Sequence, residues 1–294
     1  MENRVTFRAK GLPYLLVLPQ MVIIFMFFFW PAGQALLQSF YMQDAFGLSL
    51  QFVGLENFSV LFTDSIYLKS IGTSFLFSFF VTFTSLSSAL FLAVIVTKIR
   101  KRGLFYKTMI IWPYAVAPIV AGVLWMFLFN PTVGIISYAL KKGFGIGWNH
   151  ILNGAQAFIL VVIAASWKQI SYNFLFFTAG LQNIPETLLE AAAIDGASPV
   201  RRFWGVVFPL LKPTTFYLLV MNIVYAFFET FGIIQQVTAG GPGHATNIMV
   251  FKVYRDGFLG LDLGSSSAQS VILMAIVIIL TLLQFRFIER KIEY

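Results

Sequence analysis

Six long apolar segments dominate the sequence, and stretches rich in Gly, Pro, Asn, Asp and charged residues separate them. An α-helix rises 1.5 Å per residue, so about 20 apolar residues cross the roughly 30 Å hydrocarbon core of a membrane. The segments predicted to do so are residues 12–33, 73–97, 108–129, 157–180, 213–234 and 268–288. Their apolar runs are continuous rather than alternating, which favours helices over membrane β-strands. The pattern therefore predicts an all-α polytopic membrane protein with six transmembrane helices.

Lys and Arg are distributed unevenly between the two sets of connecting segments. Fourteen of the 20 lie in the N-terminal tail, in residues 98–107 and 201–212, and near the C-terminus. Five lie in the other loops, and Lys168 stands inside the fourth segment. Cytoplasmic loops collect basic residues, so both termini are expected in the cytoplasm. The first apolar run is longer than the 7–15 residues of a secretory signal, which favours an uncleaved span over a cleaved leader.

The spans suggest a division of the chain into three parts. Residues 1–72 would form an N-terminal tail, the first span and a periplasmic segment; residues 73–288 would form a core with five spans; residues 289–294 would form a cytoplasmic tail. The outer loops are long enough to hold short surface helices. They are either a docking face or ordinary connectors.

Composition agrees with a membrane location and narrows the chemistry. Hydrophobic residues make up 59% of the chain and charged residues 11%, with a mean hydropathy of +0.82, which excludes a soluble globular enzyme and a disordered tail. The absence of Cys excludes thiolate metal sites and a cysteine nucleophile. The two histidines, His150 and His244, are far apart, and no cluster has metal-ligand spacing. Topology explains the net charge of +8 better than nucleic-acid binding does.

The cytoplasmic segment 183–213 is predicted to form a helix, a turn and a second helix. Asn183 is a candidate N-cap, and Glu186 suits the positive end of the helix dipole. Gly196 is predicted to end the first helix in a left-handed turn, and Ser198 to begin the second. Asp195 is unfavourable at the negative helix end, which hints at an external partner, although a plain hairpin also needs charges and caps.

Several motifs give the chain a family resemblance. The segment 190–209 matches the EAA motif through Glu190-Ala191-Ala192, Gly196 and Val206-Val207-Phe208-Pro209, with conservative departures at Val206 and Phe208. Other landmarks are Trp30-Pro31, residues 52–58 and Thr238-x-Gly240-Gly241-Pro242. The chain resembles the sugar-permease branch of the binding-protein-dependent ABC importer permeases. Within it, residues 12–17, 167–177 and 260–263 are similar to permeases of sn-glycerol-3-phosphate importers.

The resemblance implies a type I ABC importer permease fold in the bacterial inner membrane and a subunit that is not an enzyme. It implies sn-glycerol-3-phosphate as the cargo, with a sugar or another polyol phosphate as the alternative. Implied partners are a second, E-type permease in a heterodimer, two ATPase subunits that use ATP and Mg, a periplasmic binding protein and membrane lipid. The chain itself has no phosphate loop, so no cofactor is expected in it. The implied ATPase-coupling residues are Glu190, Ala191, Ala192, Asp195 and Gly196.

Polar residues inside the spans are candidates for the translocation path. Lys168 is predicted near mid-membrane, where ionisable groups usually face a bundle interior, a partner charge or a water-filled path. The candidates are Lys168, Tyr172, Asn173, Asn222 and Glu229. A structural ion pair between Lys168 and Glu229, or a lysine that snorkels to the interface, is the alternative.

Two further segments have open interpretations. Gly240, Gly241 and Pro242 are either a flexible turn or, as the resemblance suggests, a loop that touches the binding protein or the pore mouth. The basic run 98–107 could bind anionic lipid, although topology already explains it.

Two other function classes compete with the importer permease. An ion-coupled secondary transporter would need internal repeats and broken helices. An intramembrane enzyme would need a nucleophile with a base, or a metal cluster. The sequence shows neither set of features.

Overall fold

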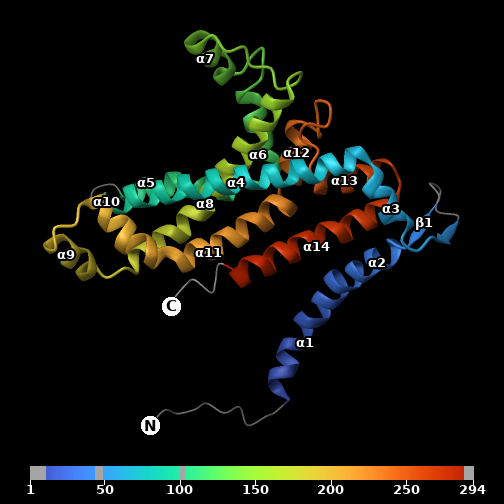
Figure 1. Ribbon diagram of the computed structural model, residues 1–294, viewed down its shortest axis with the longest axis horizontal. Coiled ribbons are helices and arrows are strands. Elements are labelled where there is room, and N and C mark those ends of the chain that lie inside the picture. The colour runs from blue at the N-terminus through green and yellow to red at the C-terminus, as the bar shows by residue number, and fades with distance from the viewer. Residues whose placement is uncertain (1–10, 44–48, 100–102, 288–294) are drawn as a thin grey trace.

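The computed structural model describes residues 11–43, 49–99 and 103–287 and forms an elongated helical bundle (Figure 1). Four long helices lie along its axis: α4 (Ser65–Thr97), α8 (Gly154–Gln182), α11 (Phe208–Val224) and α14 (Leu263–Phe287). The other α-helices are α1 (Leu12–Ile24), α2 (Trp30–Gln38), α3 (Glu56–Thr63), α5 (Gly103–Ile111), α6 (Pro118–Leu128), α7 (Ile135–Phe144), α9 (Glu186–Ile194), α10 (Pro199–Arg202), α12 (Phe231–Val237) and α13 (Met249–Tyr254). A short antiparallel ribbon pairs β1 (Tyr41–Gln43) with β2 (Leu50–Phe52).

The predicted helical membrane protein is confirmed, with one change in the spans. Five continuous helices are long and apolar enough to cross a membrane: Leu12–Gln38, Ser65–Thr97, Gly154–Gln182, Pro199–Glu229 and Leu263–Arg286. The predicted third span is instead a pair of helices, Gly103–Ala115 and Pro118–Leu128, bent by 105°. The described residues therefore hold five spans, or six if the bent pair is one. The predicted tails 1–10 and 289–294 lie outside these residues.

Proline explains the break in the third span. Pro118 has no amide to donate to the carbonyl of Tyr114, four residues earlier, and its ring disfavours a helical residue before it. Ala117 accordingly has extended backbone angles, φ −60° and ψ 143°. An apolar run alone predicted a straight helix, because hydropathy ignores this steric effect.

The predicted cytoplasmic hairpin also differs from the expectation in two details. Asn183 follows the last residue of α8 as its C-cap, whereas Pro185 precedes α9, so the predicted N-cap role of Asn183 is wrong. The second helix of the hairpin is the beginning of the fifth span, which runs without interruption from Pro199 to Glu229. Pro213 lies inside that helix rather than at its start.

Small side chains line a buried face of α4, which packs against α8, α11 and α13. Buried Ser, Thr and Ala recur every three or four residues along one face of α4, at Ser70, Ser74, Ser78, Thr82, Ser85, Ala89 and Ala93. Membrane helices gain little from the hydrophobic effect against lipid, so small residues that bring backbones together supply the contact.

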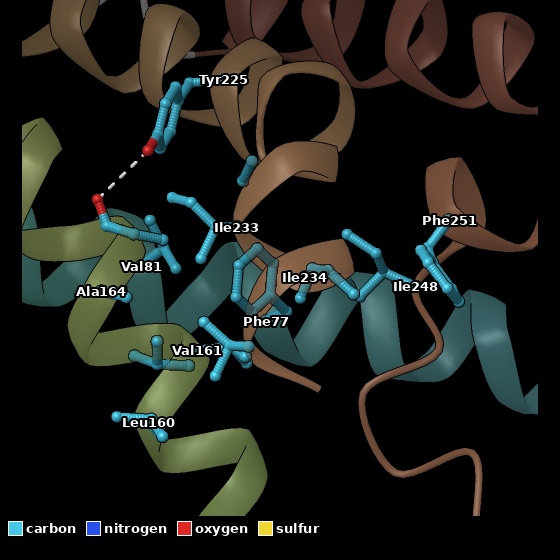
Figure 2. Close-up of a cluster of buried hydrophobic side chains, with 14 of the residues drawn as sticks. Phe77, Val81, Leu160, Val161, Ala164, Tyr225, Ile233, Ile234, Ile248 and Phe251 are labelled. Carbon is cyan, nitrogen blue, oxygen red and sulfur yellow. Dashed lines mark hydrogen bonds between the residues drawn. The ribbon is translucent and has the colours of Figure 1, made fainter. Parts of the chain in front are cut away.

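Larger apolar side chains fill the space where α4 and α8 meet the later helices. Figure 2 shows Phe77 from α4 and Val161 from α8 packed against Ile233 of α12 and Phe251 of α13. The hydroxyl of Tyr225 donates a hydrogen bond to the carbonyl of Ala165 at 3.2 Å. This cluster fixes the end of the fifth span against α8.

The N-terminal helix α1 stands away from the bundle in Figure 1 and contains no buried residue. Only its continuation α2 contacts the bundle, along α14. The proposed boundary after residue 72 would cut the continuous helix α4. The division into 1–72, 73–288 and 289–294 stays a prediction.

Candidate functional site

The predicted coupling segment forms an exposed knob at one end of the bundle. In Figure 1, α9 protrudes at the left, beyond the ends of α8 and α11. None of its residues is buried, and Ile194 is 86% exposed. Glu190, Ala191, Asp195 and Gly196 are all exposed, and Ala192 is half-buried. A short helix without intramolecular cover on its outer face has the shape of a docking element.

The end of α9 has the predicted left-handed glycine. Gly196 has φ +78°, and its amide donates to the carbonyl of Ala193 at 3.1 Å. The next amide, of Ala197, reaches back to the carbonyl of Ala192 at 3.0 Å. These two bonds make a Schellman motif, which satisfies carbonyls at the helix end. The motif needs a residue at Gly196 that adopts positive φ without strain from a Cβ atom. Ser198 then accepts a hydrogen bond from the amide of Arg201 at 3.4 Å, as predicted for the start of the second helix.

Lys168 lies halfway along α8, and its contacts differ from the ion pair with Glu229 that was the alternative to a path role. Its Nζ donates to the carbonyl of Tyr114 at 2.9 Å and lies 5.1 Å from the centre of the Tyr114 ring. That carbonyl is the one that Pro118 leaves without a helical donor. The ion pairs among the described residues all involve Lys252 or Arg255, so Lys168 and Glu229 do not form one. Glu229 is exposed at the end of the fifth span.

Tyr172 is one helical turn beyond Lys168 and belongs to the same surface. Its hydroxyl lies 3.0 Å from that of Tyr217, and its ring lies 5.8 Å from the ring of Tyr114. Lys168 and Tyr172 are half-buried, whereas Tyr114 and Tyr217 are exposed. One ammonium and three phenols therefore share a partly open face, which can donate hydrogen bonds to an anion.

Asn173 and Asn222 form a separate, closed pair. Each side-chain amide donates to the other, at 3.1 and 2.8 Å, and Ser85 Oγ donates to Asn222 Oδ1 at 2.8 Å. All three side chains are fully buried. Interhelical amide bonds of this kind hold membrane helices together. The two asparagines therefore join α8 to α11 and, through Ser85, to α4, and their place on the translocation path stays a prediction.

The predicted outer loop is compact rather than a loose turn. Gly240 has φ +80°, and Thr246 Oγ1 donates to the carbonyl of Gly241 at 3.0 Å. Gly241 and Pro242 line a pocket of about 290 Å³ together with His150. Burial lowers the pKa of His150 and outweighs the opposing effect of the Phe129 carbonyl, so this imidazole is neutral at pH 7. These contacts hold the loop in one shape.

A buried charge cluster lies near this loop and was missing from the sequence prediction. Lys252 is 4% exposed, and its Nζ lies 3.2 Å from Asp64 Oδ2 and 2.6 Å from Asp256 Oδ2. Burial acts to raise the pKa of Asp64, but the Ile66 amide and Lys252 outweigh it and leave this pKa below its ordinary value. The stabilisation that Asp64 contributes is thus present at neutral pH and is lost as pH falls through the lowered pKa.

The residues that sequence reasoning missed had weak local signals. Lys252 and Asp256 are four residues apart, the spacing of a helical ion pair, but Lys252 was counted only as an outer basic residue. Tyr114 and Tyr217 come from other spans, and nothing in one sequence places them beside Lys168. Within the described residues, no group of three or more His, Asp or Glu side chains could hold a metal ion.

Comparison with known proteins shows the family to which the chain belongs. A family described as the inner membrane component of binding-protein-dependent transport systems matches residues 58–294. The chain belongs to this family. The permease is therefore a multi-pass inner-membrane subunit of a binding-protein-dependent ABC importer, and a transport component rather than an enzyme.

Curated relatives match the permease over its whole length. It is 57% identical over 292 residues to the sn-glycerol-3-phosphate transport system permease protein UgpA of Rhizobium meliloti (strain 1021), with 99% of each chain covered. Identity to the protein of that name from Agrobacterium fabrum is 59% over 290 residues, again with 99% of each chain covered. For Escherichia coli (strain UTI89) it is 56% over 293 residues, with 100% of this chain and 99% of the relative covered.

Solved structures confirm the fold. A chain of a bacterial ABC transporter involved in the import of the acidic polysaccharide alginate aligns with a TM-score of 0.83 at 17% identity, with 96% of both chains covered. A chain of a bacterial alginate ABC transporter in complex with a pentasaccharide-bound periplasmic protein aligns with a TM-score of 0.81 at 18% identity, covering 95% and 94% of the two chains. At these identities the likeness shows the ABC importer permease fold alone.

Proposed function

We propose that this permease forms half of the translocation path for sn-glycerol-3-phosphate. The observation that carries the proposal is the 57% identity over 292 residues to a permease named for that substrate, with 99% of each chain covered. The partly open face of Lys168, Tyr114, Tyr172 and Tyr217 agrees with an anionic cargo, because a phosphate ester leaving water needs compensating positive charge and hydrogen-bond donors.

The proposal includes the partners that such a path requires. A second, E-type permease would form the other half, and a periplasmic binding protein would deliver the cargo, with Gly240, Gly241 and Pro242 as candidate contacts. Two ATPase subunits would use ATP and Mg and receive α9, with Glu190, Ala191, Ala192, Asp195 and Gly196 at the contact. The exposure of α9 supports this assignment, because a knob of this kind can fit a cleft in another protein.

Uptake by whole cells tests the proposed cargo. Cells that lack this subunit should not accumulate labelled sn-glycerol-3-phosphate, and the gene on a plasmid should restore uptake. Competition by excess unlabelled sugars and other polyol phosphates measures the substrate range. Unimpaired uptake in the deleted cells, or complete competition by a sugar alone, would reject sn-glycerol-3-phosphate as the cargo.

The orientation of the chain is a second part of the proposal, with both termini and α9 in the cytoplasm. The chain contains no Cys, so a single introduced thiol reports one position. A Ser198→Cys variant should react with a membrane-impermeant thiol reagent in inside-out vesicles but not in intact spheroplasts. A thiol introduced at exposed Leu261, beyond α13, should give the opposite pattern. Labelling of Ser198→Cys only from the periplasmic side would contradict the orientation.

A further inference from the structure

A large cavity lies at the end of the bundle where α4 and α8 stop and the hairpin begins. Its volume is about 860 Å³. Most of its wall is apolar, with Val94 from α4, Leu181 from α8, and Phe203 and Val207 from the start of the fifth span. A cavity with this lining suits a hydrocarbon chain better than a hydrated solute.

Two cations, Lys98 and Arg202, and one carboxylate, Glu186, line the cavity, so its lining is net positive. Lys98 is the C-cap of α4, and Arg202 is the last residue of α10. Neither takes part in an ion pair within residues 11–43, 49–99 and 103–287. Arg202 Nε is buried and has no hydrogen-bond partner in that part of the chain. A buried N–H without an acceptor is costly, so the site favours an occupant that brings an anionic oxygen.

The position of the cavity selects the source of that anion. Two membrane-spanning helices, α4 and α8, both end at it, which places it at the level of lipid headgroups. The same end carries Lys98, Lys107 of α5 and Arg201 and Arg202 of α10, and anionic lipid of the cytoplasmic leaflet attracts such clustered basic residues. A free phosphate ion would use Lys98 and Arg202 but would leave the apolar wall unfilled.

We propose that this cavity binds one anionic phospholipid, with the headgroup phosphate held by Lys98 and Arg202 and an acyl chain along Val94, Leu181 and Phe203. The site rests on the proposed orientation of the bundle but not on the identity of the cargo. The lipid would bridge the end of α4 to α10 directly beside α9, so the proposal joins the coupling hairpin to the inner leaflet.

Trp204 lines the cavity and provides a probe. The full transporter would be reconstituted in vesicles of phosphatidylethanolamine that contain increasing fractions of brominated phosphatidylglycerol or brominated phosphatidylcholine. Since the chain has six Trp, the Trp204 signal is the difference between the native protein and a Trp204→Phe variant. We expect phosphatidylglycerol to quench it at a fraction about tenfold lower than phosphatidylcholine does.

Charge variants show whether the two cations cause that preference. Lys98→Gln and Arg202→Gln together should raise the half-quenching fraction of phosphatidylglycerol toward the phosphatidylcholine value. The matched control is Arg201→Gln, which removes the same charge from the same helix at an exposed position that does not line the cavity, and it should behave like the native protein.

Four results would overturn the proposal. Equal quenching by the two lipids would show ordinary bilayer contact. An effect of Arg201→Gln as large as that of the double variant would show that any surface charge has the same influence. Displacement of the brominated lipid by millimolar inorganic phosphate would show a site for a free anion. Quenching in the isolated permease but not in the full transporter would show that the ATPase covers the cavity. None of these readouts depends on sn-glycerol-3-phosphate uptake.

Discussion

A Gly196→Val variant should lose transport and substrate-stimulated ATP hydrolysis together, each by about tenfold or more. Gly196 has φ +78°, where a β-branched residue is strained, although a Cβ at this position would meet no atom within 4 Å. The effect is thus conformational rather than steric crowding. It would break the Schellman motif and turn the end of α9 away from its partner. The measurement is ATP hydrolysis by the reconstituted transporter beside uptake in the same vesicles.

A second substitution at the same position separates the turn from general damage. Asn tolerates the left-handed region, so Gly196→Asn should keep most of both activities. The amount of assembled transporter in the membrane should be normal for the Asn variant, and binding-protein affinity for the cargo should be unchanged in both. If Gly196→Val kept uptake and hydrolysis at native levels, the hairpin would be only a connector.

Replacing Lys168 by Met should lower uptake about tenfold or more while the complex still assembles. The ammonium stands halfway along a spanning helix, and one of its donors is used by the Tyr114 carbonyl, which leaves two for a passing phosphate. Initial uptake rates at several cargo concentrations would measure the loss. Lys69→Met is a suitable control, because Lys69 is an exposed lysine on α4.

Lys168 also bonds to the bend of the third span, so the effect of its charge on uptake must be distinguished from its effect on the bend. Lys168→Gln keeps an N–H donor for the Tyr114 carbonyl but has no charge. If transport needs the charge, Gln should be as impaired as Met; if only the bend matters, Gln should restore uptake. Recovery of Lys168→Met on neutralising Glu229 would favour the ion pair that the structure does not contain.

The sequence predicted most of what depends on local chemistry. Hydropathy located the first, fourth and sixth spans to within about five residues at each end. Gly196 was correctly assigned to a left-handed helix end, because glycine adopts positive φ without Cβ strain. The same local reasoning failed at Asn183. Three residues separate the end of α8 from the start of α9, and an asparagine between them could cap either helix. Glycine is chemically selective at a helix end, whereas asparagine is compatible with several roles.

The rest of the site depends on contacts between distant segments. Asn173 and Asn222 are 49 residues apart, and only the packing of α8 on α11 shows that they bond to each other. An ion pair of Lys168 with Glu229 was the alternative to a path role, because ionisable groups inside membranes often pair. Its partner is instead a backbone carbonyl at the bend. Reasoning from the pattern of side chains does not consider backbone acceptors.

The contact between Lys168 and the bend has an evolutionary consequence. Pro118 creates a carbonyl without a donor at Tyr114, and Lys168 of another helix supplies the donor. A relative with any other residue at the position of Pro118 regains a backbone amide that can satisfy this carbonyl. Such a lineage is free to lose the lysine without leaving this carbonyl without a donor. Across relatives, the two positions are therefore expected to covary, and the loss of the proline to precede the loss of the lysine.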